Sequence, residues 1–119
     1  MTSHIEETAR RLRGAYSGAV LPPLRDALDP VDAAGAYAVQ EANTRFWRDQ
    51  GRVVVGRKAG LTAKAVQEQL GVDQPDFGVL FDDMRIADGG AIDPARTIQP
   101  KAEADIAFVL GADLPPPPV

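Results

Sequence analysis

Apolar residues recur at helical spacing in the first part of the chain. Ile5, Ala9, Leu12 and Tyr16 are three or four positions apart, which predicts one helix with a single buried face. The preceding run from Ser3 to Glu6 fits a capping box, in which both side chains satisfy free backbone amides. We therefore expect a helix that begins near residue 4 and ends at the glycines and prolines of residues 14–23.

Two further helices are predicted by the same pattern. The second is expected to begin at Asp29-Pro30, with Asp29 as N-cap and Pro30 at the first helical position, and to end at Gly51. Its apolar face is predicted to comprise Val31, Ala34, Ala38, Ala42 and Phe46. The third is expected to run from Thr62 to Gly71, with Ala63, Val66 and Leu70 facing inward.

Short β-branched or alternating segments predict strands. Residues 53–55 predict a short buried strand, residues 77–81 a second, and residues 84–86 a third short one. Asp88-Gly89-Gly90 is typical of a hairpin turn. Residues 104–110 form the clearest strand pattern, and they are apolar on both faces, as in a central strand.

The order of these elements, with helices before strands, favours an α+β fold. Little chain follows residue 110 to cover the last strand, and the proline-rich residues 114–119 cannot form a helix or a central strand. We therefore expect that the sequence stops before the fold does, or that a partner completes it.

Composition narrows the class of protein. The chain has 119 residues, a formal net charge of −4 and no cysteine, which excludes disulfides and cysteine metal sites and argues against nucleic acid or an anionic membrane as partner. No apolar run is long enough to span a membrane, and the N-terminus lacks the features of a signal peptide. The expected location is the cytoplasm.

Two carboxylates at the start of the last predicted strand are candidate metal ligands. Glu103 and Asp105 are two residues apart, so in a strand they would share a face with Cα atoms about 6.5 Å apart. Carboxylate oxygens that converge in this way suit a hard divalent cation such as Mg²⁺ or Mn²⁺. The alternative is an exposed strand start at which Lys101 forms salt bridges with them.

Lys58 and Asp76 are the other candidates. Lys58 follows the predicted valine strand, where it could direct a cation into a cleft, or it could simply be a surface lysine. Asp76 precedes the strand at 77–81, where an Asp between Pro and Gly often forms a turn. The glycine spacing fits no phosphate-binding loop, and the single histidine, His4, leaves no Ser-His-Asp triad.

Several long segments resemble one enzyme family. Residues 56–62 (GRKAGLT), 69–84 (QLGVDQPDFGVLFDDM) and 99–110 (QPKAEADIAFVL) resemble motifs of the 2-oxopent-4-enoate hydratases, which belong to the fumarylacetoacetate hydrolase superfamily. Residues 36–40 resemble the N-terminal helix of that family, and the similarity extends over residues 33–114.

The resemblance implies a metal-dependent hydro-lyase of aromatic catabolism. Such an enzyme adds water to 2-hydroxypenta-2,4-dienoate and gives 4-hydroxy-2-oxopentanoate, with Mg²⁺ or Mn²⁺ as cofactor. Glu103 and Asp105 fall on two of the family's three metal-binding carboxylates, although the family usually has Glu where this chain has Asp105. Lys58 and Asp76 fall on its catalytic residues. A homo-oligomer is also implied.

The resemblance also predicts a domain organisation. Residues 1–60 would be a helical region with a short strand, residues 61–114 the start of the β-rich catalytic domain, and residues 115–119 a linker. The third metal-binding carboxylate would lie beyond residue 119. Two alternatives stay open: a 4-oxalocrotonate-type decarboxylase of the same superfamily, and an inactive truncated fragment.

Overall fold

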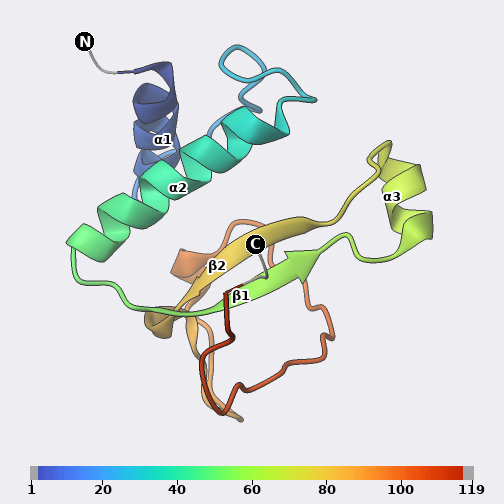
Figure 1. The fold of residues 1–119 in the computed structure, drawn as a ribbon. Coiled ribbons are helices and arrows are strands. Elements are labelled where there is room, and N and C mark those ends of the chain that lie inside the picture. The colour runs from blue at the N-terminus through green and yellow to red at the C-terminus, as the bar shows by residue number, and fades with distance from the viewer. Residues whose placement is uncertain (1–2, 117–119) are drawn as a thin grey trace.

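The computed structural model describes residues 3–116. Its elements follow in the order α1 (His4–Gly14), α2 (Ala33–Asp49), β1 (Val54–Gly60), α3 (Lys64–Leu70) and β2 (Asp76–Phe81). Two short 3-10 helices, Asp82–Met84 and Pro94–Arg96, come after β2. Helices α1 and α2 lie together beside the two-stranded sheet, and α3 lies at the far end of the sheet (Figure 1). The predicted α+β fold class is confirmed.

Helix α1 forms as its sequence predicts. The Ser3 hydroxyl accepts a hydrogen bond from the Glu6 backbone N–H at 3.2 Å, which caps the helix start. Ala9 and Thr8 are its buried residues. Tyr16 lies beyond the end of the helix and is 75% exposed, so it does not belong to the buried face.

The start of α2 differs from the prediction. Asp32, not Asp29, is the N-cap, and its carboxylate accepts from the Gly35 N–H at 2.8 Å. The Asp29 carboxylate accepts instead from the Val31 N–H at 2.9 Å. This local turn competes with helix formation, as aspartate side chains often do. The helix therefore starts three residues later and leaves Val31 88% exposed.

The buried face of α2 is also rotated from the predicted one. Val39, Ala42 and Asn43 are buried, whereas Phe46 is 42% exposed. The core consists of Ala9, Val39 and Ala42, with Ile5, Leu12 and Leu28 packed against them. Only Ala42 was predicted correctly on this face, because helical spacing does not specify where a second helix will dock.

Strands β1 and β2 are antiparallel, and their pairing extends from Val54 opposite Phe81 to Gly60 opposite Asp76. The register is irregular between Val54 and Gly56. Strand β1 is longer than the predicted residues 53–55, and it is not buried, because Val53 and Val55 are about half exposed. Strand β2 agrees with its prediction to within one residue.

Helix α3 connects the two strands. It ends at Gly71 as predicted, where the backbone takes the left-handed conformation with φ of 70°. It begins at Lys64 rather than Thr62, and it buries Gln67 instead of Val66 and Leu70, which are exposed. The apolar positions of this short helix therefore do not mark its buried side.

The C-terminal strands predicted by the sequence do not form. Residues 104–110 have no strand structure, and Ile106, Phe108 and Val109 are 86% or more exposed. A strand is stabilised by hydrogen bonds to a neighbour, and within residues 3–116 no strand pairs with this segment. Residues 84–86 are not a strand either. Gly89, with φ of 74°, does form a turn, but no strands flank it.

An aromatic cluster joins the end of α2 to the sheet. The Trp47 ring contacts Tyr16 and Phe81 edge-on, at centroid distances of 5.2 and 5.9 Å. The Arg52 guanidinium lies 4.0 Å from the Phe81 ring centroid and forms two hydrogen bonds with the Asp83 carboxylate, at 2.6 and 2.7 Å. Phe81 is 2% exposed, so this cluster closes one end of the sheet.

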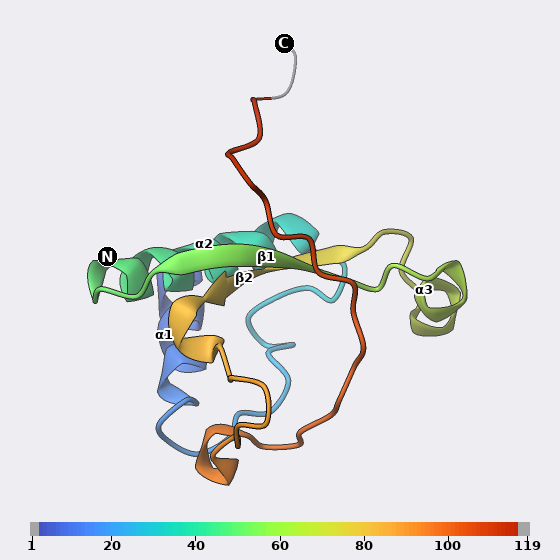
Figure 2. The same cartoon turned by 90° about the horizontal axis from the view of Figure 1, so that it is seen from below.

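Figure 2 shows the chain after residue 100 passing beside the sheet and then running away from the body of the molecule. Among residues 3–116, no helix is both long and apolar enough to cross a membrane.

Candidate functional site

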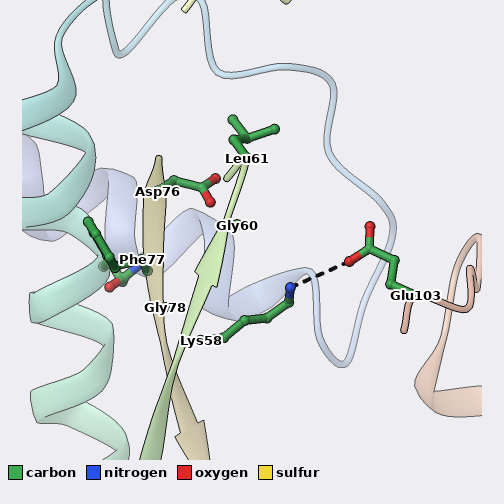
Figure 3. A pocket seen from close by; sticks show the side chains of 8 residues that line it. Lys58, Gly60, Leu61, Asp76, Phe77, Gly78 and Glu103 are labelled. Carbon is green, nitrogen blue, oxygen red and sulfur yellow. Dashed lines mark hydrogen bonds and ion pairs between the residues drawn. The ribbon is translucent and has the colours of Figure 1, made fainter. Parts of the chain in front are cut away.

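One face of the two-stranded sheet carries two of the predicted site residues. Lys58 lies opposite Gly78, and Gly60 lies opposite Asp76. Side chains two apart on a strand point to the same side, so these four residues share a face. Lys58 and Asp76 are diagonal neighbours, about 7 Å apart at this register, and the two glycines leave the space between them open (Figure 3).

This face forms the floor of a pocket of about 420 Å³. Gln40 of α2 and Glu103 of the C-terminal segment stand at its sides. The complete lining is Gln40, Lys58, Gly60, Leu61, Asp76, Phe77, Gly78 and Glu103. Three of the four predicted site residues therefore line one pocket, although they are up to 45 positions apart in the sequence.

The Lys58 ammonium meets both predicted metal-binding carboxylates. Its Nζ lies 3.4 Å from Glu103 Oε2 and 3.3 Å from Asp105 Oδ2. The hydrogen bond and charge of Asp105, followed by those of Glu103, raise the pKa of the Lys58 amine above its ordinary value. Lys58 is therefore held as an ammonium that donates hydrogen bonds to both carboxylates. It lies inside β1, not after it as predicted.

Glu103 and Asp105 converge on one point, but not for the predicted reason. They do not share the face of a strand, because residues 104–110 form none. Both carboxylates instead turn toward the same ammonium, and both side chains are more than 60% exposed. Their oxygens are the donors that hard divalent cations prefer, so the donor chemistry fits such an ion. Within residues 3–116, however, no cluster of three or more potential metal ligands occurs.

Asp76 is held close to the backbone of the opposite strand. A Cβ built on Gly60 would lie 2.2 Å from Asp76 Oδ1, which is too close for any real side chain. Gly60 is therefore needed for Asp76 to keep this position.

Leu61 directly follows and has φ of 54°. The left-handed conformation costs a residue with a side chain about 1 kcal/mol. The buried Gln67 side chain donates a hydrogen bond to the Leu61 carbonyl at 2.6 Å and so helps to hold this conformation.

Helix α2 supports the pocket from the free edge of β2. The Phe77 N–H donates to Tyr37 Oη, and the Gln40 amide donates to the Phe77 carbonyl, both at 3.0 Å. The backbone N–H and C=O of Phe77, which face away from β1, are thereby both hydrogen-bonded by side chains of α2. Sequence reasoning missed this contact. Its signal was a pair of polar residues one helical turn apart within residues 36–40.

Comparison with known proteins shows what this chain is similar to. The structure superposes on 4-oxalocrotonate decarboxylase from Pseudomonas putida G7, solved with calcium and acetate, with a TM-score of 0.74 and 28% identity, over 82% of this chain and 39% of that one. The same enzyme solved with magnesium and adipate gives a TM-score of 0.64 and 25% identity, over 72% and 34% of the two chains. The fold is thus that of part of a fumarylacetoacetate hydrolase superfamily enzyme.

Sequence relatives are more specific. 2-Keto-4-pentenoate hydratase 2 of Dechloromonas aromatica is 56% identical over 110 residues, which are 92% of this chain and 42% of that protein. The TodF product hydratase of Pseudomonas putida is 53% identical over 98 residues, or 82% and 37% of the two chains. No family model matches. Over 92% of its length the chain is thus similar to 2-keto-4-pentenoate hydratases, and it spans about two-fifths of the length of the curated relatives it matches.

Proposed function

We propose that this chain supplies part of the active site of a metal-dependent hydratase that converts 2-hydroxypenta-2,4-dienoate to 4-hydroxy-2-oxopentanoate. The observation that carries the proposal is the single pocket that Lys58, Asp76 and Glu103 line together beside the two glycines of the sheet face. The names of the relatives support the reaction, since both sequence relatives described above are named hydratases.

The proposal assigns Glu103 and Asp105 as two ligands of a divalent cation, Mg²⁺ or Mn²⁺. Their convergence on the Lys58 ammonium supports this, because a position that attracts one cation between two carboxylates suits another. When bound, such an ion would act as a Lewis acid that stabilises negative charge on the substrate oxygens. The calcium and magnesium in the solved decarboxylase structures support a divalent ion.

The catalytic roles are assigned to Lys58 and Asp76. Lys58, as an ammonium, would donate a hydrogen bond to the C2 oxygen while enolate charge develops there. Asp76 would orient a water molecule at the other end of the pocket and accept its proton. The dienol first gains a proton at C5 and loses its hydroxyl proton, which gives a 2-oxo-3-enoate. Water then adds with its oxygen at C4 and a proton at C3.

A decarboxylase acting on 2-oxo-3-hexenedioate is the second candidate. It is favoured by the superposition on 4-oxalocrotonate decarboxylase, and it would use the same stabilisation of an enolate. The two reactions are distinguished by assaying the purified chain with each substrate, following loss of the dienoate in one assay and release of carbon dioxide in the other. Turnover of the hexenedioate alone would replace the proposed reaction by decarboxylation.

Metal binding is tested first by calorimetric titration of Mn²⁺ into the chain, with and without oxalate as a mimic of the 2-oxo acid. We expect binding that oxalate strengthens. The variants Glu103→Gln and Asp105→Asn should each weaken Mn²⁺ binding by at least about tenfold, because each removes one charged ligand. Asp113→Asn, in the same C-terminal segment, is the matched control. Equal binding by all three variants would refute the metal assignment.

Three broader assignments accompany this proposal. We infer a cytoplasmic protein, a homo-oligomer, and a division into a helical region of residues 1–60, a catalytic region of residues 61–114 and a linker. The metabolic reactions in the relatives' names support the cytoplasmic location. Sedimentation of the purified chain would test the second, and limited proteolysis near residue 60 the third.

A further inference from the structure

Leu61 stands between two hollows. It lines the charged pocket described above, and it also lines a neighbouring groove of about 800 Å³ between α2, the preceding loop and the α3–β2 connection. The groove is lined by more apolar residues, which include Leu24, Leu28, Leu70 and Val72. Gln40, Leu61, Asp76 and Phe77 line both hollows, so the two are continuous at this point.

Leu61 is the aliphatic side chain at that junction. Phe77 lies opposite Ala59, so its side chain points to the sheet face away from Lys58. Gln40 is tied to the Phe77 carbonyl at 3.0 Å. In Figure 3 the Leu61 side chain stands at the Asp76 end of the pocket, away from Lys58 and Glu103.

The backbone of Leu61 takes a conformation that is strained for a residue with a side chain. With φ of 54°, the position favours glycine or asparagine, and strained residues of this kind cluster at functional sites. Leu61 is half-buried, and its carbonyl is fixed by Gln67 at 2.6 Å. The isobutyl group is therefore held at the junction and cannot simply turn away with the chain.

We propose that Leu61 is a specificity-determining residue that limits the length of the apolar tail of a bound 2-oxo acid. This inference rests on the proposed function. The acid group binds toward the Lys58 ammonium, and the tail extends toward Leu61. A tail of three carbons beyond the oxo group ends at Leu61, whereas a longer tail meets the side chain and is excluded from the groove.

The test is a series of saturated 2-oxo acids with four, five, six and eight carbons, titrated into the chain by calorimetry in the presence of Mg²⁺. In the natural chain, affinity should fall by about tenfold or more beyond five carbons, the scale on which a pocket discriminates a methylene. Leu61→Gly suits the backbone conformation and opens the junction. In this variant the eight-carbon acid should bind as tightly as the five-carbon acid or more tightly. Leu61→Met should restore the discrimination.

Gly89→Leu provides a matched control for the strain itself. Gly89 has φ of 74° and free space around it, so this change places a leucine in a similar backbone conformation outside both hollows. Its preference among the acids should stay that of the natural chain. An unchanged ratio of eight-carbon to five-carbon affinity in Leu61→Gly would overturn the inference while leaving the hydratase proposal standing. Failure of every acid to bind the natural chain would overturn both.

Discussion

At the residue scale, the absence of a side chain at Gly60 allows the Asp76 carboxylate to lie where it does. The two residues are directly opposite on paired strands, and the carboxylate leans over the glycine. The sequence singled out Lys58 and Asp76, because they flank apolar segments, but it did not reveal that both lie on one face. That relation depends on the register of β1 and β2, and the irregularity between Val54 and Gly56 cannot be read from either strand alone.

Gly60→Ala should therefore disable the pocket without unfolding the sheet. The added Cβ would lie 2.2 Å from Asp76 Oδ1, so the carboxylate must move away. We expect binding of 2-oxo acids to weaken by about tenfold or more, because a displacement of this size disrupts ligand orientation. Calorimetry measures the binding and far-ultraviolet circular dichroism the fold.

Gly56→Ala is the control, since its new Cβ would meet Leu80 at an ordinary 3.7 Å in the same strand. If Gly60→Ala binds as tightly as Gly56→Ala, the contact with Asp76 does not position the carboxylate.

The ion pair of Arg52 and Asp83 predicts a pH dependence of stability. Hydrogen bonding and charge from Arg52 lower the pKa of Asp83. The pair therefore stabilises the fold above the ordinary aspartate pKa of about 3.9, and this contribution is lost as the pH falls through the lower pKa of the folded state. Because the Asp83 side chain is 47% exposed, the contribution is at most about 1 kcal/mol.

Asp83→Asn should thus be less stable than the natural chain at pH 6, and the difference should disappear near pH 2. Urea denaturation at both pH values measures the free energy of unfolding. A difference that is the same at both would show that the stability comes from packing of Arg52 on Phe81 and not from the charge of Asp83.

At the element scale, helices were easier to predict than their ends and faces. Capping and periodicity located α1 and the end of α3, because those signals are local. The start of α2 was wrong, since Asp29 and Asp32 both have the side chain for an N-cap and only the folded backbone distinguishes them. The same limit explains the buried Gln67, whose carbonyl partner Leu61 belongs to the preceding loop.

The two aspartates give a direct test of which one caps α2. Asp32→Ala should lower the free energy of unfolding by about 1 kcal/mol, because the Gly35 N–H loses its acceptor at the helix start. Asp29→Ala removes only a turn contact and should change it by less than about 0.5 kcal/mol. Urea denaturation of both variants, followed by circular dichroism, makes the comparison. A larger effect at Asp29 would restore the helix start predicted from the sequence.

At the scale of the whole molecule, the most unusual feature is an apolar segment that nothing covers within residues 3–116. Ile106, Phe108 and Val109 are 87%, 86% and 97% exposed. The sequence predicted a buried central strand over residues 104–110, and this prediction was wrong. The strand is absent because strand formation depends on a partner for the backbone, and that dependence is not encoded in the segment itself.

An exposed β-prone segment of this kind promotes association between chains. We therefore expect the purified protein to self-associate as its concentration rises, and Phe108→Lys to reduce this association. Sedimentation velocity over a range of concentrations is the measurement. Val31→Lys is the control, because Val31 is equally exposed, at 88%, but lies in a turn. Identical behaviour of the two variants would exclude the segment as the site of association.

The aromatic cluster has a practical consequence for anyone who studies this protein by optical spectroscopy. Trp47 is the single tryptophan of the chain, and it touches Tyr16, which follows α1, and Phe81 of β2. Its fluorescence therefore comes from one defined place, where the helical pair meets the sheet. A shift in its emission would report separation of Trp47 from Phe81, and so of the helices from the sheet. Excitation of Tyr16 followed by emission from Trp47 would report instead that the segment after α1 is still packed against α2.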